Sequence, residues 1–353
     1  MKIIIINNLF PPYDRGGAEK VVIRHITELI GNSHQVVLIT TKPSRAKPNS
    51  NYQGVPIHHL NSHYLSLGDW PMALRPIWHL ANIFSWRKYL QLKKILILEK
   101  PDLVITHNLM GMGFMTPLVL RQLNIRHEHW LHDIQLLHPS GIMIIGEEKK
   151  ISGLCAKIYQ LINYLLFSSP TTIKSPSQWL LTEHIQRGFF SKSDLQVVSN
   201  QIKEINSFAK QPKTIKKFLY VGQLERHKGV DLLISAFKQL TQIDLSLDII
   251  GDGQEIIKLK SLAENDKRIK FYGRLLAPEV LKFMEISDLL VVPSLCYENS
   301  PTVIYEAQKA ATPVLASNIG GIPEIITKKD RLFQAGDEKD LLDKMKELIE
   351  IEH

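Results

Sequence analysis

Short apolar runs rich in β-branched residues alternate with segments of helical periodicity along the whole chain. This alternation is typical of parallel β-sheets whose strands are joined by helices that cover both faces. The runs predict strands at residues 2–7, 35–40, 103–107, 171–175 and 195–198, and then at residues 217–221, 245–250, 269–272, 289–293 and 314–317. The fold class indicated is α/β, with two doubly wound sheets in succession.

Residues 203–216 interrupt this pattern with a polar, basic, proline-containing stretch, which predicts a linker. A chain of 353 residues also fits two domains of about 150 residues each. We therefore expect an N-terminal domain over residues 1–205 and a C-terminal domain over residues 206–353. Because ligands of open α/β sheets bind beyond the carboxyl ends of the strands, we expect the active site to lie between the domains.

The composition narrows the class of protein. Apolar residues make up 44% of the chain and charged residues 22%, which excludes disordered and collagen-like classes. Cys155 and Cys296 are the only cysteines, too few for a disulfide framework or a paired-cysteine zinc site. No signal peptide is recognisable and no apolar run approaches about 18 residues, so we expect a cytoplasmic protein. The 43 basic and 35 acidic residues leave a net charge of +8, which favours an anionic partner.

Gly16 and Gly17 follow the first predicted strand and open a helical pattern. A glycine pair at a helix start lets the backbone approach an anion, with free amides and the positive end of the helix dipole directed at it. A plain turn before a helix has the same pattern, and both interpretations stay open.

Arg226 and Lys228 lie in a polar loop between the predicted strand at residues 217–221 and an amphipathic helix. Beyond the carboxyl end of a strand, an arginine fork and a lysine can neutralise a diphosphate. The alternative is a pair of solvated loop charges.

The most specific segment is residues 293–307. Ser300 as the N-cap and Pro301 as the first helical residue predict a helix with free amides at its start. Glu298 precedes this helix and Glu306 lies on it, so two carboxylates able to bind sugar or ribose hydroxyls frame amides able to bind phosphate. The alternative is a capped surface helix with an incidental glutamate.

Together these segments resemble glycosyltransferase family 4, the retaining nucleotide-sugar enzymes of GT-B fold. The matches run in the family's order and comprise Gly16-Gly17-Ala18-Glu19, residues 221–222 and 228–231, residues 250–253, residues 271–273, residues 298–306 and residues 313–324. The resemblance implies two Rossmann-like domains that face a shared cleft. It implies further that the N-terminal domain binds the acceptor and the C-terminal domain binds the nucleotide sugar.

The resemblance also implies roles for individual residues. The amide of Gly17 contacts the donor phosphate, Lys228 neutralises the diphosphate, Glu306 binds the ribose and Glu298 positions the sugar. The catalytic residues implied are His132, which forms a His-Asp pair with Asp133, together with Glu298 and Lys228. The donor-binding residues implied are Gly16, Gly17, Arg226, Lys228, Arg274, Leu275, Glu298, Asn299, Ser300, Thr302, Val303 and Glu306.

The histidines at 127, 129 and 132 also suggest a metal cluster, because His127 and His129 share one face of a strand. No cysteine is nearby, and buried neutral imidazoles are commonly structural hydrogen-bonding groups. The chain has no Asp-x-Asp sequence to hold a metal diphosphate. We therefore expect no metal and no cofactor, and the diphosphate charge should be met by arginine, lysine and helix ends.

Three departures from the family pattern stand out. Gln223 occupies the place of a usual arginine, for which Arg226 is the candidate replacement, and Ala311 occupies the place of a usual glycine. The sequence stops at His353 soon after a predicted helix at residues 339–351, so we expect the family's closing helix, which crosses back to the first domain, to be short or absent and domain closure to be looser.

Aromatic and basic residues interleave between Trp70 and Glu99, and residues 85–99 have amphipathic helical character. This pattern suits an anionic membrane surface that carries a lipid-linked acceptor. The alternative is a helix packed on the sheet with a solvated basic face. Residues 158–167 are similarly apolar, and we expect them to be core.

The function implied is that of a hexosyltransferase. It would move a sugar from a nucleoside diphosphate sugar, UDP- or GDP-linked, to a glycan or lipid-linked acceptor with retained anomeric configuration. The process would be cell-surface polysaccharide or glycolipid synthesis, in the cytoplasm or peripherally on the inner face of the membrane, with no nucleic acid partner. Two rivals are a catalytically impaired module that only binds nucleotide or a partner, and a glycosidase that uses Glu298 and Glu306. A nicotinamide oxidoreductase is disfavoured because residues 251–253 lack the third glycine of that fingerprint.

Overall fold

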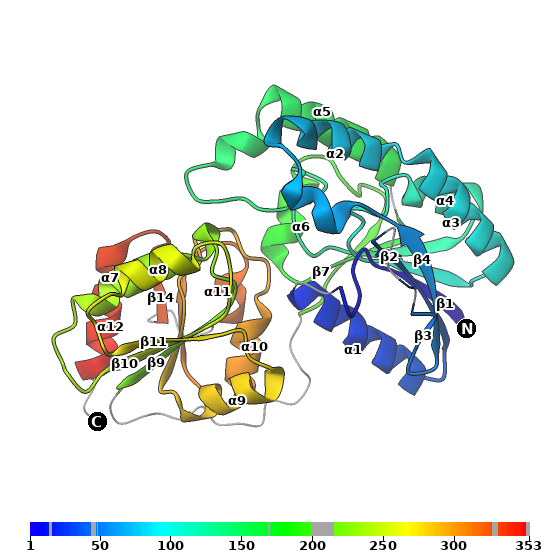
Figure 1. Ribbon diagram of the computed structural model, residues 1–353. Helices are drawn as coiled ribbons and strands as arrows, with labels where there is room; N and C mark the ends of the chain where they lie inside the picture. The colour runs from blue at the N-terminus through cyan, green and yellow to red at the C-terminus, as the bar shows by residue number, and fades with distance from the viewer. Residues whose placement is uncertain are drawn as a thin grey trace. The chain divides into compact units, whose positions relative to one another are not determined.

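The computed structural model describes residues 1–13, 16–43, 47, 49–168, 170–199, 215–326 and 331–350. The chain forms two compact units, each described here by itself (Figure 1). The N-terminal unit comprises Met1–Ile142 and Lys149–Val198, and the C-terminal unit comprises Met143–Glu148 and Ser199–His353. The predicted boundary at residues 205/206 lies outside the described residues, as does nearly all of the predicted linker.

The N-terminal unit contains a sheet of order β3-β4-β2-β1-β5-β6-β7-β8, parallel except for the β3–β4 pair. Its strands are β1 (Lys2–Ile6), β2 (Gln35–Lys42), β3 (Asn51–Tyr52), β4 (Val55–Asn61), β5 (Leu103–Thr106), β6 (Arg126–Trp130), β7 (Thr172–Ser175) and β8 (Asp194–Val197). Its helices are α1 (Gly17–Gly31), α2 (Arg75–Ile83), α3 (Trp86–Glu99), α4 (Thr116–Gln122), α5 (Leu154–Phe167) and α6 (Gln178–Ile185). In Figure 1, α1 lies on one side of the sheet and α2 to α5 lie on the other.

All five predicted strands of the first half are confirmed within two residues; β3 and β4 were missed, and β6 was not among the five either. Its sequence, Arg-His-Glu-His-Trp, has no apolar run, yet it lies between β5 and β7. The hydroxyl of Thr106 lies 2.7 Å from both His127 Nε2 and His129 Nδ1. Polar side chains therefore occupy a central strand because they hydrogen-bond to each other.

The C-terminal unit contains a parallel sheet of order β11-β10-β9-β12-β13-β14. Its strands are β9 (Lys217–Val221), β10 (Ser246–Ile250), β11 (Ile269–Gly273), β12 (Leu289–Val292), β13 (Val314–Ser317) and β14 (Leu332–Phe333). Its helices are α7 (Val230–Lys238), α8 (Ile256–Leu262), α9 (Ala277–Ile286), α10 (Thr302–Lys309), α11 (Ile322–Ile325) and α12 (Glu338–Glu350). The five strands predicted for this half are confirmed, and only the two-residue β14 was missed.

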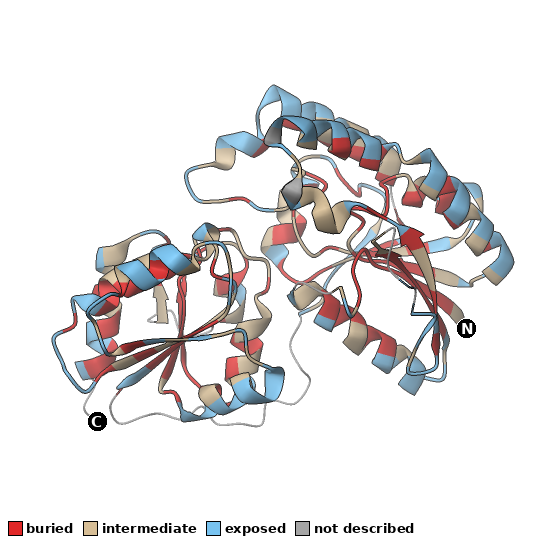
Figure 2. Ribbon diagram, in the orientation of Figure 1, coloured by how far each residue is buried: buried red, intermediate tan, exposed pale blue. Residues whose placement is uncertain are grey.

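Both faces of this sheet are buried, as the red strands in Figure 2 show. Side chains alternate along β9, so that Phe218 and Tyr220 pack in one core while Leu219 packs in the other. The first core includes Phe237 of α7, and the second includes Ile304 of α10. This two-sided burial accounts for a strand such as β12, Leu-Leu-Val-Val, which is apolar at every position.

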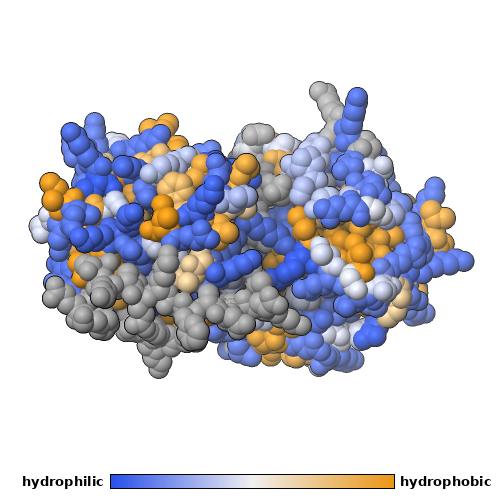
Figure 3. Space-filling model, turned by 90° about the horizontal axis from the view of Figure 1, so that it is seen from below, coloured by the Kyte–Doolittle hydropathy of each residue, from blue (hydrophilic) through white to orange (hydrophobic). Residues whose placement is uncertain are grey.

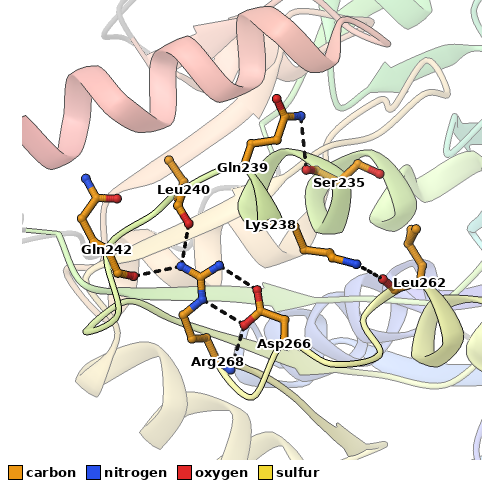
Figure 4. A network of polar contacts seen from close by, with 8 residues as sticks. All are labelled: Ser235, Lys238, Gln239, Leu240, Gln242, Leu262, Asp266 and Arg268. Atoms are coloured by element: carbon orange, nitrogen blue, oxygen red, sulfur yellow. Dashed lines mark hydrogen bonds and ion pairs between the residues drawn. The ribbon is translucent and has the colours of Figure 1, made fainter.

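A polar network holds the edge of this sheet at which β10 and β11 begin (Figure 4). Arg268 donates to the carbonyls of Leu240 at 2.7 Å and Gln242 at 2.9 Å, and it forms two further bonds with the Asp266 carboxylate. Its guanidinium also lies 4.9 Å from the ring centre of Phe237. One arginine thus ties together two connections at this edge, opposite to the edge that carries the candidate site.

Candidate functional site

The loops after β9 and β12 meet at the carboxyl edge of the C-terminal sheet. Strand β9 has β10 on one side and β12 on the other, so the chain reverses its direction of progress through the sheet at this point. The amides of Leu295 and Cys296 donate to the carbonyl of His227 at 2.9 and 3.2 Å, which joins the two loops. Such a switch point is the usual ligand site of an open α/β sheet.

An ion pair lies at this junction. Lys228 Nζ of the first loop is 2.5 Å from Glu298 Oε1 of the second, and the two side chains are 22% and 17% exposed. The same carboxylate oxygen accepts from Ser294 Oγ at 3.1 Å and from Cys296 Sγ at 3.6 Å. The lysine and the carboxylate are therefore both held in place before any ligand binds.

The pair fixes the charge state of its members. Burial would lower the pKa of Lys228, but the adjacent Glu298 carboxylate outweighs burial and raises it. Burial would likewise raise the pKa of Glu298, and Lys228 brings it below its ordinary value. Burial, followed by the Glu298 charge, raises the pKa of the Cys296 thiol, and burial, followed by the Lys228 charge, lowers the pKa of His227 to about 4. At neutral pH the site therefore holds one ammonium, one carboxylate, a thiol and a neutral imidazole.

Two glycines allow the loops to close this tightly. Gly229 has a φ of +66°, and a Cβ there would lie 2.0 Å from the carbonyl oxygen of Pro293. Gly320, after β13, has a φ of +61°, and a Cβ there would lie 2.3 Å from the carbonyl oxygen of Glu298. The next amide, of Gly321, donates to that same carbonyl at 2.7 Å. A side chain at either glycine would displace the backbone that carries the ion pair.

Helix α10 begins one residue later than predicted. The N-cap is Pro301, in an extended conformation with ψ of 118°, and the predicted N-cap Ser300 instead places its hydroxyl 2.9 Å from that of Tyr305. Thr302 and Val303 form the first turn, where backbone amides have no acceptor within the helix. The prediction of free amides at this position is unaffected by the shift.

The other predicted donor-binding residues of this unit lie at the same edge of the sheet. Asn299 and Glu306 are half-buried, in the loop before α10 and in its second turn. Arg226 is exposed in the short turn that ends at Lys228, and Arg274 is exposed directly after β11. Leu275 packs on the core beneath α9 and α10. The structure thus joins Lys228 to Glu298, and it leaves the two arginines directed to solvent.

Several residues that contact Glu298 or brace its loop were not predicted from the sequence. Ser294 and Cys296 contact Glu298, but nothing in a loop sequence indicates which way such side chains turn. The segment Met143–Glu148, which belongs to the C-terminal unit, was not predicted either. The amide of Ile145 donates to the carbonyl of Leu295, and that of Tyr297 donates to the carbonyl of Met143, both at 2.9 Å. The loop that carries Glu298 is therefore also braced by a distant part of the chain.

In the N-terminal unit, Gly16 and Gly17 lie at the start of α1, as predicted. Gly16 is the N-cap, and its amide donates to Glu19 Oε2 at 3.0 Å. The carboxylate of Glu19 therefore already occupies one amide of this helix end. The loops after β1 and β5 meet here, since the amide of Asn8 donates to the carbonyl of Asn108 at 2.9 Å.

His132 follows β6 and lines a pocket of the N-terminal unit together with His107, Asn108, Trp130 and Asp133. Its Nε2 lies 2.8 Å from His107 Nδ1, and burial lowers its pKa to about 4. The amide of Gln135 donates to Asp133 at 2.7 Å, and burial raises the pKa of Asp133 to about 7. His132 is therefore a neutral imidazole at physiological pH, with one nitrogen hydrogen-bonded to a second histidine.

The described part of the chain contains no group of three or more histidine, cysteine, aspartate or glutamate side chains placed to hold a metal ion. No helix among those residues has the length and apolar character needed to cross a bilayer.

Several known proteins are similar to this chain in sequence. A protein similar over 333 residues, at 26% identity, is an uncharacterized 42.6 kDa protein in the cps region of Klebsiella pneumoniae, with 92% of this chain and 87% of that protein covered. Glycogen synthase of Mycobacterium tuberculosis is 27% identical over 349 residues, covering 92% and 80% of the two chains.

Among solved structures, Anabaena HepE in complex with UDP-glucose has a TM-score of 0.70 at 18% identity, covering 99% of this chain and 90% of that one. Sucrose-phosphate synthase from Thermosynechococcus elongatus has a TM-score of 0.72 at 17% identity, covering 98% and 89%. Both share the GT-B fold. Residues 15–203 match the model of Glycosyltransferase Family 4 and residues 201–353 match that of Glycosyl transferases group 1. The chain therefore belongs to glycosyltransferase family 4.

Proposed function

We propose that this protein is a retaining hexosyltransferase that moves a sugar from a nucleoside diphosphate sugar to a glycan or lipid-linked acceptor. Cell-surface polysaccharide or glycolipid synthesis at the cytoplasmic face of a membrane is the proposed setting. Support comes from HepE, which is similar in fold and is described in complex with UDP-glucose, and from the similar glycogen synthase.

The observation that carries the donor assignment is the ion pair between Lys228 and Glu298 at the switch point. Lys228 has three N–H donors, and Glu298 accepts only one of them, so two can bind the oxygens of a diphosphate. The first amides of α10, from Thr302 and Val303, supply further donors and the positive end of a helix dipole. These groups stabilise the charge that develops on the departing diphosphate.

The remaining donor contacts are proposed by position. Glu306, one turn into α10, would bind the ribose hydroxyls, and Glu298 with Asn299 would position the transferred sugar. The backbone at Arg274 and Leu275 would border the base. Arg226, which is exposed and has a long reach, would supply the cation that Gln223 lacks.

The N-terminal unit would contribute the start of α1 and His132. Gly16 and Gly17 would bring amides to the donor phosphate, with Glu19 releasing the Gly16 amide. His132, whose pKa of about 4 keeps it neutral, would hydrogen-bond to the sugar as an uncharged group. Attack by the acceptor hydroxyl on the face from which the diphosphate departs would retain the anomeric configuration.

The charge state of Glu298 limits its role in the glycosidase alternative. A glycosidase needs one protonated carboxylic acid beside one carboxylate. Lys228 lowers the pKa of Glu298, so this group is ionised at neutral pH and could serve only as the carboxylate, an oxygen of which is already bound by Lys228.

The test is transfer activity with a panel of UDP-, GDP- and ADP-sugars, with the anomeric configuration of the product read by NMR. Wild type should transfer from at least one donor with retention, and both Lys228→Ala and Glu306→Ala should lose that activity. Lys238→Ala is a matched control, because Lys238 is exposed and, among the described residues, donates to the Leu262 carbonyl at the opposite edge of the sheet. Full activity of both site variants would refute the site. Binding of UDP without turnover on any acceptor would favour the impaired module instead.

A further inference from the structure

Helix α5 directs polar side chains to the protein interior and apolar side chains to solvent, which is the reverse of an ordinary surface helix. Its buried face carries Gln160 and Asn163. Gln160 Nε2 donates to the carbonyls of Leu137 at 3.0 Å and Ile151 at 2.7 Å, and Asn163 Nδ2 donates to the carbonyl of Leu136 at 3.0 Å. The inner face therefore holds an irregular loop by polar bonds.

The outer face of α5 is an apolar stripe. Leu154, Ile158, Leu161 and Leu165 are 75%, 52%, 57% and 62% exposed, and their spacing of four, three and four places them on one side of the helix. Figure 2 shows this outer surface as exposed. The expectation that residues 158–167 are core was therefore wrong for this face.

Helices α2 and α3 carry the same feature. Ile77, Leu80 and Phe84 form an exposed stripe along α2, at spacings of three and four, and Trp86 and Leu90 are exposed on α3. Helix α4 packs against both α3 and α5, which places these helices on the same side of the sheet (Figure 1). Scattered apolar patches among hydrophilic residues, as in the view from below in Figure 3, are ordinary for a protein surface. Ordered stripes on several helices of one side of the sheet indicate a binding surface.

The charge around the stripes has one sign. Residues 70–98 and residues 149–168 contain no aspartate or glutamate. Lys149, Lys150 and Lys157 are exposed beside α5, and Arg87 and Lys94 are exposed on α3. The two segments that carry the stripes therefore contribute cations and no anions.

We infer that α5, with α2 and α3, docks on an anionic lipid bilayer, with the stripe of Leu154, Ile158, Leu161 and Leu165 entering the boundary between headgroups and acyl chains. A second copy of the chain is a poorer occupant, because a two-fold interface would bring the cationic surface of one copy against the same cationic surface of the other. The inference deepens the proposed function and rests on it for its purpose, which is to bring the enzyme to a lipid-linked acceptor.

The experiment is co-sedimentation of the full chain with vesicles of phosphatidylcholine alone and with added phosphatidylglycerol. Wild type should bind the anionic vesicles, and binding should weaken with salt. Leu161→Gln with Leu165→Gln should lower the partition coefficient at least about tenfold, since two apolar side chains leave the bilayer. Lys149→Glu with Lys157→Glu should abolish the preference for phosphatidylglycerol.

The matched control is Ile243→Gln with Ile257→Gln, two apolar residues of the C-terminal unit that are 92% and 81% exposed. This variant should bind vesicles as wild type does. Thermal unfolding checks that the α5 variant is folded, as its substituted side chains are exposed. Equal vesicle binding by the α5 variant and wild type would overturn the inference. So would a wild-type dimer that ignores vesicles and dissociates in the α5 variant.

The failure of this inference is distinguishable from that of the proposed function. Lys228→Ala should bind vesicles normally while losing transfer, and the α5 variant should keep transfer to a soluble acceptor. Vesicle binding by a wild type that transfers no sugar would refute the proposed function alone.

Discussion

Replacing Lys228 by methionine should destabilise the C-terminal unit, because it leaves the Glu298 carboxylate without its cation. Breaking a fully buried ion pair costs about 3–5 kcal/mol. Here the carboxylate is 17% exposed and still accepts from Ser294 and Cys296, so we expect a loss of about 2 kcal/mol. Adding Glu298→Gln removes the uncompensated charge and should restore about 1 kcal/mol or more.

The loss should depend on pH with a defined sign. In wild type the pKa of Glu298 is lowered, so its ionisation contributes stability above the pKa of an unfolded glutamate, about 4.3, and that contribution is lost on acidification. In Lys228→Met, burial is opposed chiefly by the hydrogen bond from Ser294, and we expect the pKa of Glu298 to rise above the unfolded value. The variant should therefore be closest to wild type at low pH and least stable at neutral pH.

The assay must resolve the two units. All five tryptophans lie between residues 70 and 179, so tryptophan fluorescence reports only on the first half of the chain. Hydrogen exchange of the β9 and β12 amides reports on the C-terminal unit. Lys228→Met should lower protection there without moving the fluorescence transition in urea. A double variant no more stable than Lys228→Met would refute the reasoning, because the cost would then not come from an uncompensated carboxylate.

Three further predictions concern other parts of the chain. A Cβ at Gly251, where φ is +148°, would lie 1.8 Å from the Gly222 carbonyl oxygen, so Gly251→Ala should cost about 3 kcal/mol or more and abolish UDP binding in calorimetry. Burial raises the pKa of Asp133 to about 7, so wild-type stability should fall between about pH 4 and pH 7 as the unfolded chain ionises first. Asp133→Asn should escape this loss, and its advantage in urea titrations should grow over that range and then level off. Arg268→Ala should cost about 2 kcal/mol in thermal unfolding, against about 0.5 kcal/mol or less for the exposed Lys238→Ala.

The sheets were predictable because their strands are buried on both faces. A strand such as β12, Leu-Leu-Val-Val, then has no polar position, and its bounds follow directly from the apolar run. Strand β6 lies as deep in its sheet but satisfies His127 and His129 through the hydroxyl of Thr106. The partner lies 21 residues away in the chain, so no local pattern reveals that these polar residues are core.

The positions of the site residues at the edge of the sheet could be predicted from the sequence, but the contacts between them could not. Lys228 and Glu298 each follow an apolar strand, which places both at one edge of the sheet. Their direct contact depends on strand order, since β9 and β12 are neighbours in space and 70 residues separate the two side chains. The N-cap was wrong by one residue because Ser300 has a competing partner in Tyr305. Local rules rank capping residues and cannot count such tertiary competitors.

The orientation of α5 shows where periodicity stops being informative. The spacing of Leu154, Ile158, Leu161 and Leu165 defines an apolar stripe, and a stripe on a soluble helix ordinarily faces the core. What reverses the orientation is the loop at residues 135–137, whose carbonyls have no strand partner and are satisfied by the amides and hydroxyl of Gln160, Asn163 and Tyr159. The buried face of α5 is therefore the one whose side chains reach these carbonyls, and the four aliphatic side chains are left facing water. At a bilayer the requirements of the two faces no longer conflict, because the polar face keeps its carbonyls and the apolar face gains a solvent that suits it.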